Sequence, residues 1–537
     1  MWHRRTQRAM IALLAVLALI AGACGNDDDT GVGPGTDDDP GNGDVTEPTD
    51  PVDEGEAQYG GRLNYGMYQE VQGFDPVIRG GNGHPSYAIY DTLLIIDDDG
   101  NAAPHMAESI ESDDFQTWTL TLREGIEFHD GTPLDADAVV FNIERHLDPD
   151  ANSPVIGDVA SIESVEAIDD LTVQFNLRVP VAAFPTALAG GAGMIASPTA
   201  IEELGEDYNT NPVGAGPFVF AEWLPDDRTL VTRNENYWQE GLPYLDEIAF
   251  QPRPDTQTRQ ESILGGDVDM VWHLTAREIR QGQESDDIDV YLRAGNGAEG
   301  ILLNPNEPPF DDLRMRQALA HAMDYQSIAD VRFDGEMERA RSPIGEESPF
   351  FRDTSDMYPD YDPERARELI EEYRAEGNDP NFTFSAPNTP DRILFGEMVQ
   401  QVWGDVGLEV ELEFLDITEY VDRVLQQTNF QASINTMPNF AHPYPNVFNN
   451  FHSEGSSNFG NYANPEMDEA LETARSSPDE DERAEAWGTV QEIMATDLPW
   501  VFYARNATAL LTNPDLRGVV FTPQGIPYYH EMWFDAS

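Results

Sequence analysis

The sequence of 537 residues contains no lysine and a single cysteine. Its 30 basic residues are therefore all arginine, whereas aspartate and glutamate together number 100 and give a formal net charge of −70. Without a lysine amine the chain cannot form a Walker A phosphate loop, a Schiff base or a Ser-x-x-Lys hydrolase site. Nucleic acid is also excluded as an expected partner, because binding to phosphate depends on clustered lysine and arginine.

Motifs for hydrolysis are absent as well. The sequence has neither the HExxH pattern of zinc proteases nor the GxSxG pattern of serine hydrolases. No serine, cysteine or histidine motif supplies a nucleophile with its base. We therefore expect a protein that is not an enzyme and that needs no cofactor or metal. Its length predicts two or three domains, and a hydrophobic content of 40% is enough to give each a core.

The acidic residues are spread along the whole chain, which indicates a solvated acidic surface more than a site for one cationic partner. Such a surface suits a protein that works in concentrated salt, where screening removes self-repulsion. A genome rich in GC, which favours arginine codons, would explain the missing lysines equally well.

The N-terminus is typical of an exported protein. Arginines precede an apolar run at 10–23, which has the length of a signal peptide and is too short to span a membrane. Residues 1–23 are therefore predicted to be the signal. The only cysteine, Cys24, follows Ile20-Ala21-Gly22-Ala23, which resembles a lipobox, so we expect a diacylglyceryl anchor on Cys24. Cleavage after Ala23 by ordinary signal peptidase is the alternative.

Residues 24–57 contain mainly glycine, aspartate, proline and threonine. With almost no hydrophobic side chains, this segment cannot offset the entropy cost of folding. We predict an acidic, disordered tether that holds the folded part near the membrane and leaves it free to rotate.

A stretch from Trp118 to Arg145 contains the clearest local pattern. Hydrophobic residues alternate with threonines over 117–122, as in a strand with one buried face. The alternation resumes at Ile126 and Phe128, and Asp130-Gly131 follows as a turn, which together predict a hairpin.

A helix is predicted directly after this hairpin. Thr132 or Asp135 can cap its start, and hydrophobic side chains between Ala136 and Leu147 fall on one face. Elsewhere, strand-like and helical runs alternate, which indicates an α/β protein with mixed sheets. Strands are predicted at 62–67, 171–177, 382–386, 408–414 and 430–435, and helices at 312–324, 362–375, 464–476 and 478–494.

The stretch 118–145 resembles the hallmark of the family 5 solute-binding proteins of ABC importers, the peptide- and nickel-binding group. Members carry the pattern LR-x-G-x-x-F-H-D-G-x-P-x-x-A-x-D-V-x-F. The resemblance covers nearly everything after residue 58. It continues through Phe74-Asp75-Pro76 and the segments 211–218, 233–238, 264–269 and 309–324.

The resemblance implies an α/β, two-lobed periplasmic-binding-protein fold of type II with mixed sheets, an extra subdomain and a hinged cleft. Lobe I would comprise residues 58–300, with the subdomain at about 90–208, and residues 506–537 would return to it. Lobe II would comprise residues 301–505. C-terminal strands at 509–511 and 519–521 should then pack beside the N-terminal ones.

The resemblance also implies a function. A monomer on the outer face of the cytoplasmic membrane, periplasmic or at the cell surface, would capture a peptide or peptide-like solute by hinge closure. It would deliver the solute to an ABC permease, whose ATPase supplies the energy. The alternatives are a nickel-chelate ligand, an oligosaccharide or sugar conjugate, and a sensory surface protein that lacks a permease.

Three departures from the family's peptide binders concern the ligand. Ala441 stands where those proteins have an aspartate for the ligand's ammonium, and Ala386 where dipeptide binders have an arginine for the carboxylate. Ile417 replaces a lid tryptophan. Because an unpaired ammonium or carboxylate in a dry cleft is costly, we expect a ligand other than an ordinary dipeptide, such as a longer or modified peptide.

Candidate ligand contacts follow from the family's arrangement and from residue chemistry. His442 beside Tyr444 is similar to a segment of nickel-chelate binders, but a single histidine is a weak metal site, so no metal ligand is predicted. Phe448 and Phe451 have helical spacing and are expected in the core. The candidates in lobe I are Tyr68, Gln69, His84 and Tyr87, and those in lobe II are Asn388, Arg392, Asn439, Phe440, His442, Tyr444 and Asn446.

Overall fold

The computed structural model describes residues 57–535 except for 79–82, 98–100, 152, 274–275, 334, 336, 438–439, 441 and 523–524. The predicted signal, Cys24 and nearly all of the tether therefore lie outside the described residues, as do Asn439 and Ala441. Within the part that is described, no helix has both the length and the apolar character needed to cross a bilayer.

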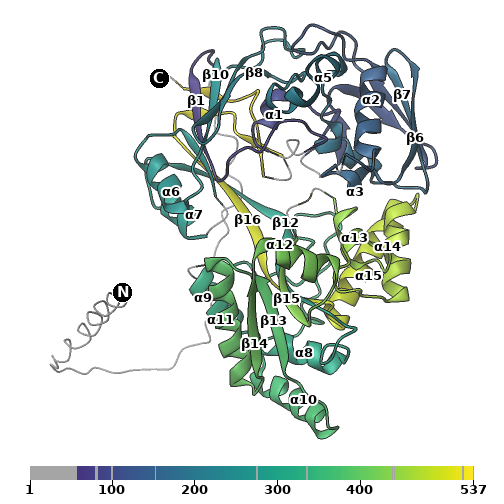
Figure 1. Cartoon of the computed structure of the whole chain (residues 1–537), viewed down its shortest axis with the longest axis vertical. Coiled ribbons are helices and arrows are strands. Elements are labelled where there is room, and N and C mark those ends of the chain that lie inside the picture. Colours follow the sequence, from purple (N-terminus) through teal and green to yellow (C-terminus); the bar gives the residue numbers. More distant parts are fainter. Residues whose placement is uncertain are drawn as a thin grey trace, which may run out of the picture. The chain divides into compact units, whose positions relative to one another are not determined.

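A ten-stranded mixed sheet organises this part of the chain (Figure 1). Its strand order is β14-β13-β15-β12-β16-β11-β1-β10-β9-β8. Strand β1 is parallel to β10 and β11, and β13 is parallel to β14 and β15, whereas the remaining neighbours are antiparallel. The bounds are β1 Arg62–Met67, β8 Phe218–Leu224, β9 Arg228–Arg233, β10 Glu247–Pro252, β11 Met270–His273, β12 Asp289–Leu303, β13 Phe382–Pro387, β14 Val410–Leu415, β15 Ala432–Met437 and β16 Trp500–Thr512.

The two longest strands, β12 and β16, pair with each other from Asp289↔Thr512 to Leu302↔Trp500. A register shift lies between Ala294 and Ala298. At one end of the pair β16 continues the sheet to β11, and at the other end β12 continues it to β15. The hydrophobic core clusters follow the same division of the sheet. Three consist of buried residues from 63–288 and 509–532, and two consist of buried residues from 298–504.

The four-stranded sheet β4-β5-β7-β6 has its own core. As predicted, 117–122 forms a strand with one buried face, and Trp118 pairs with Phe175. The helix after it is capped by Asp135, whose carboxylate accepts a hydrogen bond from the Ala138 N–H at 3.0 Å. The bounds are β4 Ala107–Glu111, β5 Thr117–Leu122, β6 Ile162–Asp169, β7 Thr172–Leu177 and α2 Ala136–Leu147.

The hairpin predicted after β5 is present but very short, with its turn at Asp130-Gly131. Glu127 and Pro133 form a single antiparallel bridge, and the Phe128 and Leu134 N–H groups donate to the carbonyls of Thr132 and Ile126 at 2.8 and 2.9 Å. The Asp130 carboxylate accepts hydrogen bonds from both the N–H and the hydroxyl of Thr132, which closes the turn. Ile126 and Phe128 are buried.

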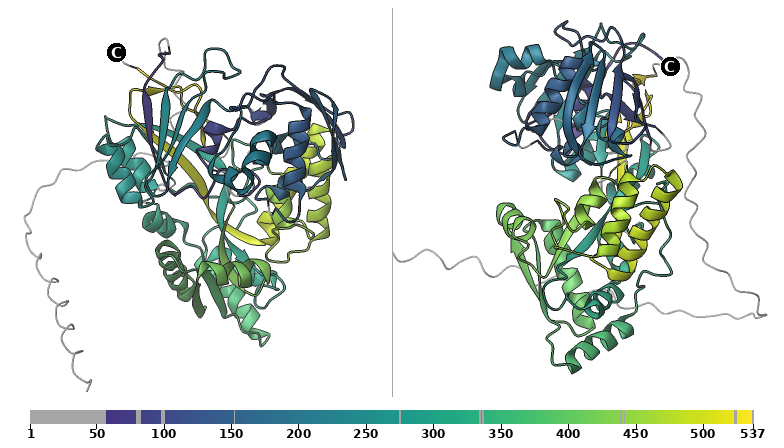
Figure 2. Two further views of the ribbon diagram at one scale, coloured as in Figure 1. Left: turned by 45° about the horizontal axis from the view of Figure 1, so that its top comes forward. Right: turned by 90° about the vertical axis from the view of Figure 1, so that its right-hand side faces the viewer.

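The predicted helices at 312–324, 362–375, 464–476 and 478–494 are confirmed with small shifts of their ends. At the C-terminus, β16 reaches β11 beside β1, whereas 519–521 does not join the N-terminal strands. Instead β18 pairs with β19 in a separate small sheet. Figure 2 shows α14 and α15 side by side. The remaining bounds are α1 Ser86–Ile89, α3 Ile156–Val159, α4 Phe184–Ala187, α5 Pro198–Leu204, α6 Thr256–Leu264, α7 Ala276–Gln283, α8 Leu313–His321, α9 Tyr325–Arg332, α10 Pro363–Ala375, α11 Pro390–Asp405, α12 Ile417–Tyr420, α13 Asn446–Phe451, α14 Pro465–Ser476, α15 Glu480–Asp497, β2 Leu94–Ile96, β3 Ala102–Pro104, β17 Leu516–Arg517, β18 Val520–Phe521, β19 Pro527–Tyr528 and β20 Trp533–Phe534.

Candidate functional site

Two of the predicted residues lie where the parallel strands β13, β14 and β15 end. Asn388 directly follows β13, and Arg392 lies in the first turn of α11. The carboxyl ends of parallel strands share one edge of a sheet, which is where α/β proteins commonly bind ligands. Asn388 is exposed, and its N–H donates to the Leu415 carbonyl at 2.7 Å.

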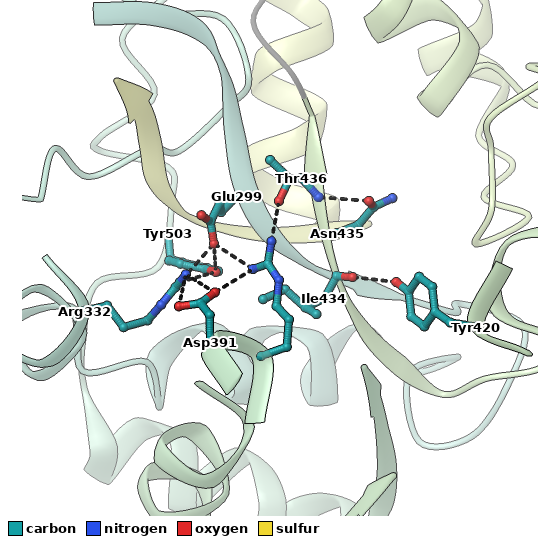
Figure 3. Close-up of polar contacts among 9 residues, drawn as sticks. Glu299, Arg332, Asp391, Tyr420, Ile434, Asn435, Thr436 and Tyr503 are labelled. Carbon is teal, nitrogen blue, oxygen red and sulfur yellow. Dashed lines mark hydrogen bonds and ion pairs between the residues drawn. The ribbon is translucent and has the colours of Figure 1, made fainter. Parts of the chain in front are cut away.

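Arg392 belongs to a network that joins five elements (Figure 3). Its guanidinium donates to Glu299 Oε2 at 3.1 Å and to Thr436 Oγ1 at 3.2 Å. Glu299, on β12, also accepts hydrogen bonds from Arg332 at 2.9 Å and from the Tyr503 hydroxyl at 2.5 Å. Arg332 in turn pairs with Asp391 at 3.0 Å. The network therefore fixes Arg392 against β12 and β15.

The neighbours of Glu299 determine its ionisation state. Burial alone would raise the pKa of Glu299, but Arg332, Arg392 and the Tyr503 hydroxyl outweigh it and lower the pKa to about 2. Glu299 is therefore ionised at neutral pH. The Arg332 side chain is only 6% exposed, whereas Arg392 is 23% exposed and keeps N–H groups that none of the described residues occupies. Arg392 is thus the more exposed of the two arginines that pair with Glu299.

In the N-terminal part of the large sheet, an aromatic cluster follows β1. The ring centroid of Tyr68 lies 4.6 Å from that of Trp272 and 5.9 Å from that of His84. His84 Nδ1 is 2.7 Å from the Tyr65 hydroxyl, and burial lowers the pKa of His84 to about 3, so its ring is neutral. Tyr68 is half-buried and Gln69, beside it, is exposed.

Tyr87 lies in α1 and is 7% exposed. Its side chain belongs to the same core as Tyr65, and burial, followed by the influence of Tyr528 and Asp158, raises the pKa of Tyr87 above its usual value. The hydroxyl is therefore protonated at any ordinary pH.

The predicted residues between β15 and α13 divide into packed and half-buried ones. Phe440 is in the core, as are Phe448 and Phe451, the last two as expected. His442 is packed: its Nδ1 accepts the Tyr444 N–H at 3.0 Å, its ring lies 4.9 Å from that of Phe350, and burial lowers its pKa to about 4. Asn446 is half-buried at the start of α13.

Tyr444 lies where the two groups of cores meet, because its side chain packs against both the β4–β7 core and the core around α13–α15. Two further contacts cross the same boundary. The Ala182 N–H donates to the Arg475 carbonyl at 2.9 Å, and the Arg483 guanidinium lies 5.7 Å from the centre of the Phe115 ring.

Several residues of the site were missed by the sequence analysis. Trp272, Glu299, Arg332, Thr436 and Tyr503 carry no motif, and they meet only because distant elements pack together. The predicted residues do not line the cavity of about 360 Å³ between β2 and β18–β19, whose walls include His105, Phe521 and His530. Within the described residues, no group of three or more His, Cys, Asp or Glu side chains could hold a metal ion.

Comparison with known proteins places this chain in a family. Residues 101–459, more than half of the chain, match the model of the bacterial extracellular solute-binding proteins, family 5. The glutathione-binding protein GsiB of Pectobacterium atrosepticum is 28% identical over 459 residues, which cover 81% of this chain and 86% of that protein. GsiB of Shigella flexneri is 28% identical over 458 residues, covering 80% and 87%.

Solved structures share the fold. A dipeptide-binding protein from a Pseudoalteromonas species, in complex with Met-Leu, has a TM-score of 0.75 at 23% identity and covers 88% of this chain and 100% of its own. The oligopeptide-binding protein AppA of Bacillus subtilis, in complex with a nonapeptide, has the same TM-score and identity, with coverage of 89% and 100%. The fold expected from the sequence is therefore confirmed. The chain belongs to the bacterial extracellular solute-binding proteins of family 5, and its role is that of the substrate-binding component of an ABC importer.

Proposed function

We propose that the protein captures a short peptide with a free carboxylate, of the size of a tripeptide such as glutathione. The observation that carries this proposal is the guanidinium of Arg392, which Glu299 and Thr436 orient while part of it stays exposed. A fixed, partly exposed arginine is suited to bind a carboxylate. Relatives named for glutathione binding, and structural neighbours solved with peptides, support the same ligand class.

Capture would occur by closure of two lobes. We assign lobe I to residues 58–300 and 506–537, with the subdomain at about 90–208, and lobe II to residues 301–505. Strands β12 and β16 connect them, and the register shift between Ala294 and Ala298 is a suitable place for bending. A solute that contacts both lobes stabilises the closed form in proportion to its additional contacts there.

The N-terminal sequence is the basis for a proposal on how the protein is attached to the cell envelope. We propose that residues 1–23 are removed, that Cys24 carries the lipid anchor, and that residues 24–57 tether a monomer to the outer face of the cytoplasmic membrane. The extracellular character of the family supports export. A permease and an ATPase would then complete the importer.

Nickel chelates are a weaker proposal, because His442 is packed and its Nδ1 already accepts a hydrogen bond. A sugar conjugate has one specific observation in its favour. The half-buried ring of Tyr68, backed by Trp272, is suited to stack on a sugar ring. Glutathione, trialanine, an oligosaccharide series and nickel–histidine therefore form the ligand set for the first experiment.

The experiment measures the melting temperature of the purified protein in high salt with each ligand. A solute that binds only the folded state at a concentration of 100 Kd adds about 2.7 kcal/mol to the free energy of unfolding. We expect a shift with the peptides. A shift with oligosaccharides alone, or with none of the ligands, would contradict the peptide proposal.

Replacing Arg392 with glutamine tests the carboxylate contact. We expect the affinity for trialanine to fall roughly 10–100-fold, because a charge-assisted hydrogen bond is lost, while the C-terminally amidated peptide binds both proteins alike. The matched control is Arg365→Gln, which removes an exposed arginine that pairs with Glu368 on α10. Calorimetric titration gives the affinities. An Arg392→Gln variant that still prefers the free carboxylate would contradict the role of Arg392.

A further inference from the structure

Asp158, in the short helix α3, is a half-buried carboxylate without a partner. Its side chain makes no hydrogen bond and no ion pair with any of the described residues. Other buried carboxylates of the chain are paired: Asp75 with Arg145 at 2.6 Å, and Glu299 with two arginines. A carboxylate removed from water without such a partner is unfavourable, and burial raises the pKa of Asp158 to about 6.

The surroundings of Asp158 come from both lobes. Its charge contributes to raising the pKa of Tyr87, from α1, and of Tyr444, from the segment before α13, so both hydroxyls lie within its electrostatic reach. The next residue in the chain, Val159, is fully buried in the subdomain core and holds α3 in place.

Helix α3 also contacts lobe II directly. A Cβ atom built on Gly157 would lie 3.5 Å from the Asn449 side-chain nitrogen, and Figure 1 shows α3 next to α13. Tyr444 packs against the cores on both sides of this boundary. Asp158 therefore lies close to Tyr87 and Tyr444, on a helix that contacts the other proposed lobe.

None of the described residues supplies a cation to this carboxylate. Arg475, which interacts with the Tyr444 hydroxyl, is itself paired with Glu472 and lies over the Phe448 ring. Tyr87 and Tyr444 are neutral. An unpaired carboxylate attracts a positively charged amine through a charge-assisted hydrogen bond.

We propose that Asp158 binds the ammonium group of the solute at this boundary between the lobes, close to Tyr444. The inference rests on the proposed function, because it names the group of lobe I that would recognise the peptide. The transported solute would then need a free amine in addition to the carboxylate that Arg392 binds.

The test uses four ligands: trialanine, glutathione and the N-acetylated form of each. Titration calorimetry compares the wild type, Asp158→Asn and the control Glu163→Gln, which removes an exposed carboxylate from β6 of the same subdomain. We expect the wild type and the control to bind the free amines roughly 10–100-fold more tightly than the acetylated forms. Asp158→Asn should bind both forms alike, at the affinity of the acetylated ones.

A second measurement separates a charge contact from a structural effect. The preference for the free amine should be strong at about pH 7.5, where Asp158 is ionised, and should weaken below about pH 6 as it takes up a proton. Circular dichroism of Asp158→Asn checks that the variant is folded.

The outcomes distinguish the two proposals. If the peptides bind but acetylation changes nothing in the wild type, or if Asp158→Asn keeps the preference, the role of Asp158 is overturned and the peptide function stands. If none of the four ligands binds the wild type, both proposals are overturned.

Discussion

At the scale of the residue, the carboxylate of Glu299 is the acceptor that two arginines and a tyrosine share. It receives Arg332, Arg392 and the Tyr503 hydroxyl within 3.1 Å. A buried acceptor that serves several cations cannot be replaced by a neutral side chain without leaving charge unpaired. The orientation of the Arg392 guanidinium therefore depends on Glu299.

Glu299→Gln should lower the free energy of unfolding by about 3–5 kcal/mol at neutral pH, because Arg332 and Arg392 lose the buried carboxylate that they share and Arg332 keeps only the exposed Asp391. The folded-state pKa of Glu299, about 2, lies below the ordinary value of 4.5. Its stabilisation is therefore fully present above about pH 4.5 and is lost as the pH falls toward 2. Denaturant unfolding between pH 7 and pH 3 should show the difference from wild type shrinking.

Glu411→Gln, on the exposed face of edge strand β14, is the matched control and should change stability little. A Glu299→Gln variant as stable as this control at neutral pH would contradict the assigned role.

The candidate site could be predicted only in part from the sequence. Arg392 was predicted because dipeptide binders of the family place an arginine after the strand that matches 382–386, and Arg392 lies nearby. Glu299, Arg332 and Tyr503 are separated by as many as 204 residues, and no local pattern indicates that they meet. Asp158 has no motif either, since an unpaired carboxylate is recognised only once its neighbours are known.

At the scale of the element, the segment at 211–218 lies against the backbone of α1. A Cβ atom on Gly216 would lie 2.6 Å from the Ile89 carbonyl, closer than atoms can approach. The glycine is needed because the two backbones touch, and this contact fixes α1, which carries Tyr87.

Gly216→Ala should therefore destabilise the protein by about 1–3 kcal/mol, the usual cost of inserting a methyl group where there is no space. Gly404→Ala in α11 is the control, since a Cβ there meets nothing within 4 Å and alanine favours a helix. Unfolding in guanidinium chloride gives both values. Equal stability of the two variants would refute the steric explanation.

Most elements were predictable because hydrophobic periodicity and helix caps are local signals. The predicted helix start at 362 is explained by Asp362, whose carboxylate accepts the Arg365 N–H at 2.9 Å. The turn of the hairpin after β5 was predictable from Asp130-Gly131, but the shortness of the hairpin was not. The alternation of Ile126 and Phe128 reports which side chains are buried and not how far the backbone pairing extends.

At the scale of the whole molecule, 100 acidic residues face only 30 arginines. Pairing can therefore neutralise fewer than a third of the carboxylates, and the remainder repel one another. Self-repulsion is screened within about 3 Å at 1 M salt, against about 10 Å at 0.1 M.

The melting temperature should therefore rise as potassium chloride is increased from about 0.1 M to about 2 M. Differential scanning calorimetry of the folded protein measures it. A chaotropic salt series serves as the control, since it screens charge equally but weakens apolar burial. A melting temperature that falls with potassium chloride would show that paired charges matter more than repelling ones.

The pairing of β12 with β16 has a consequence for how the protein is made. These strands join residue 289 to residue 512, so their ladder cannot assemble until nearly the entire polypeptide has left the ribosome. Until then one edge of β12 and one edge of β11 are unpaired, because β16 is the strand that pairs with both of these edges. The large sheet thus stays incomplete until β16 appears late in synthesis, and an incompletely folded chain is what a narrow secretion channel requires.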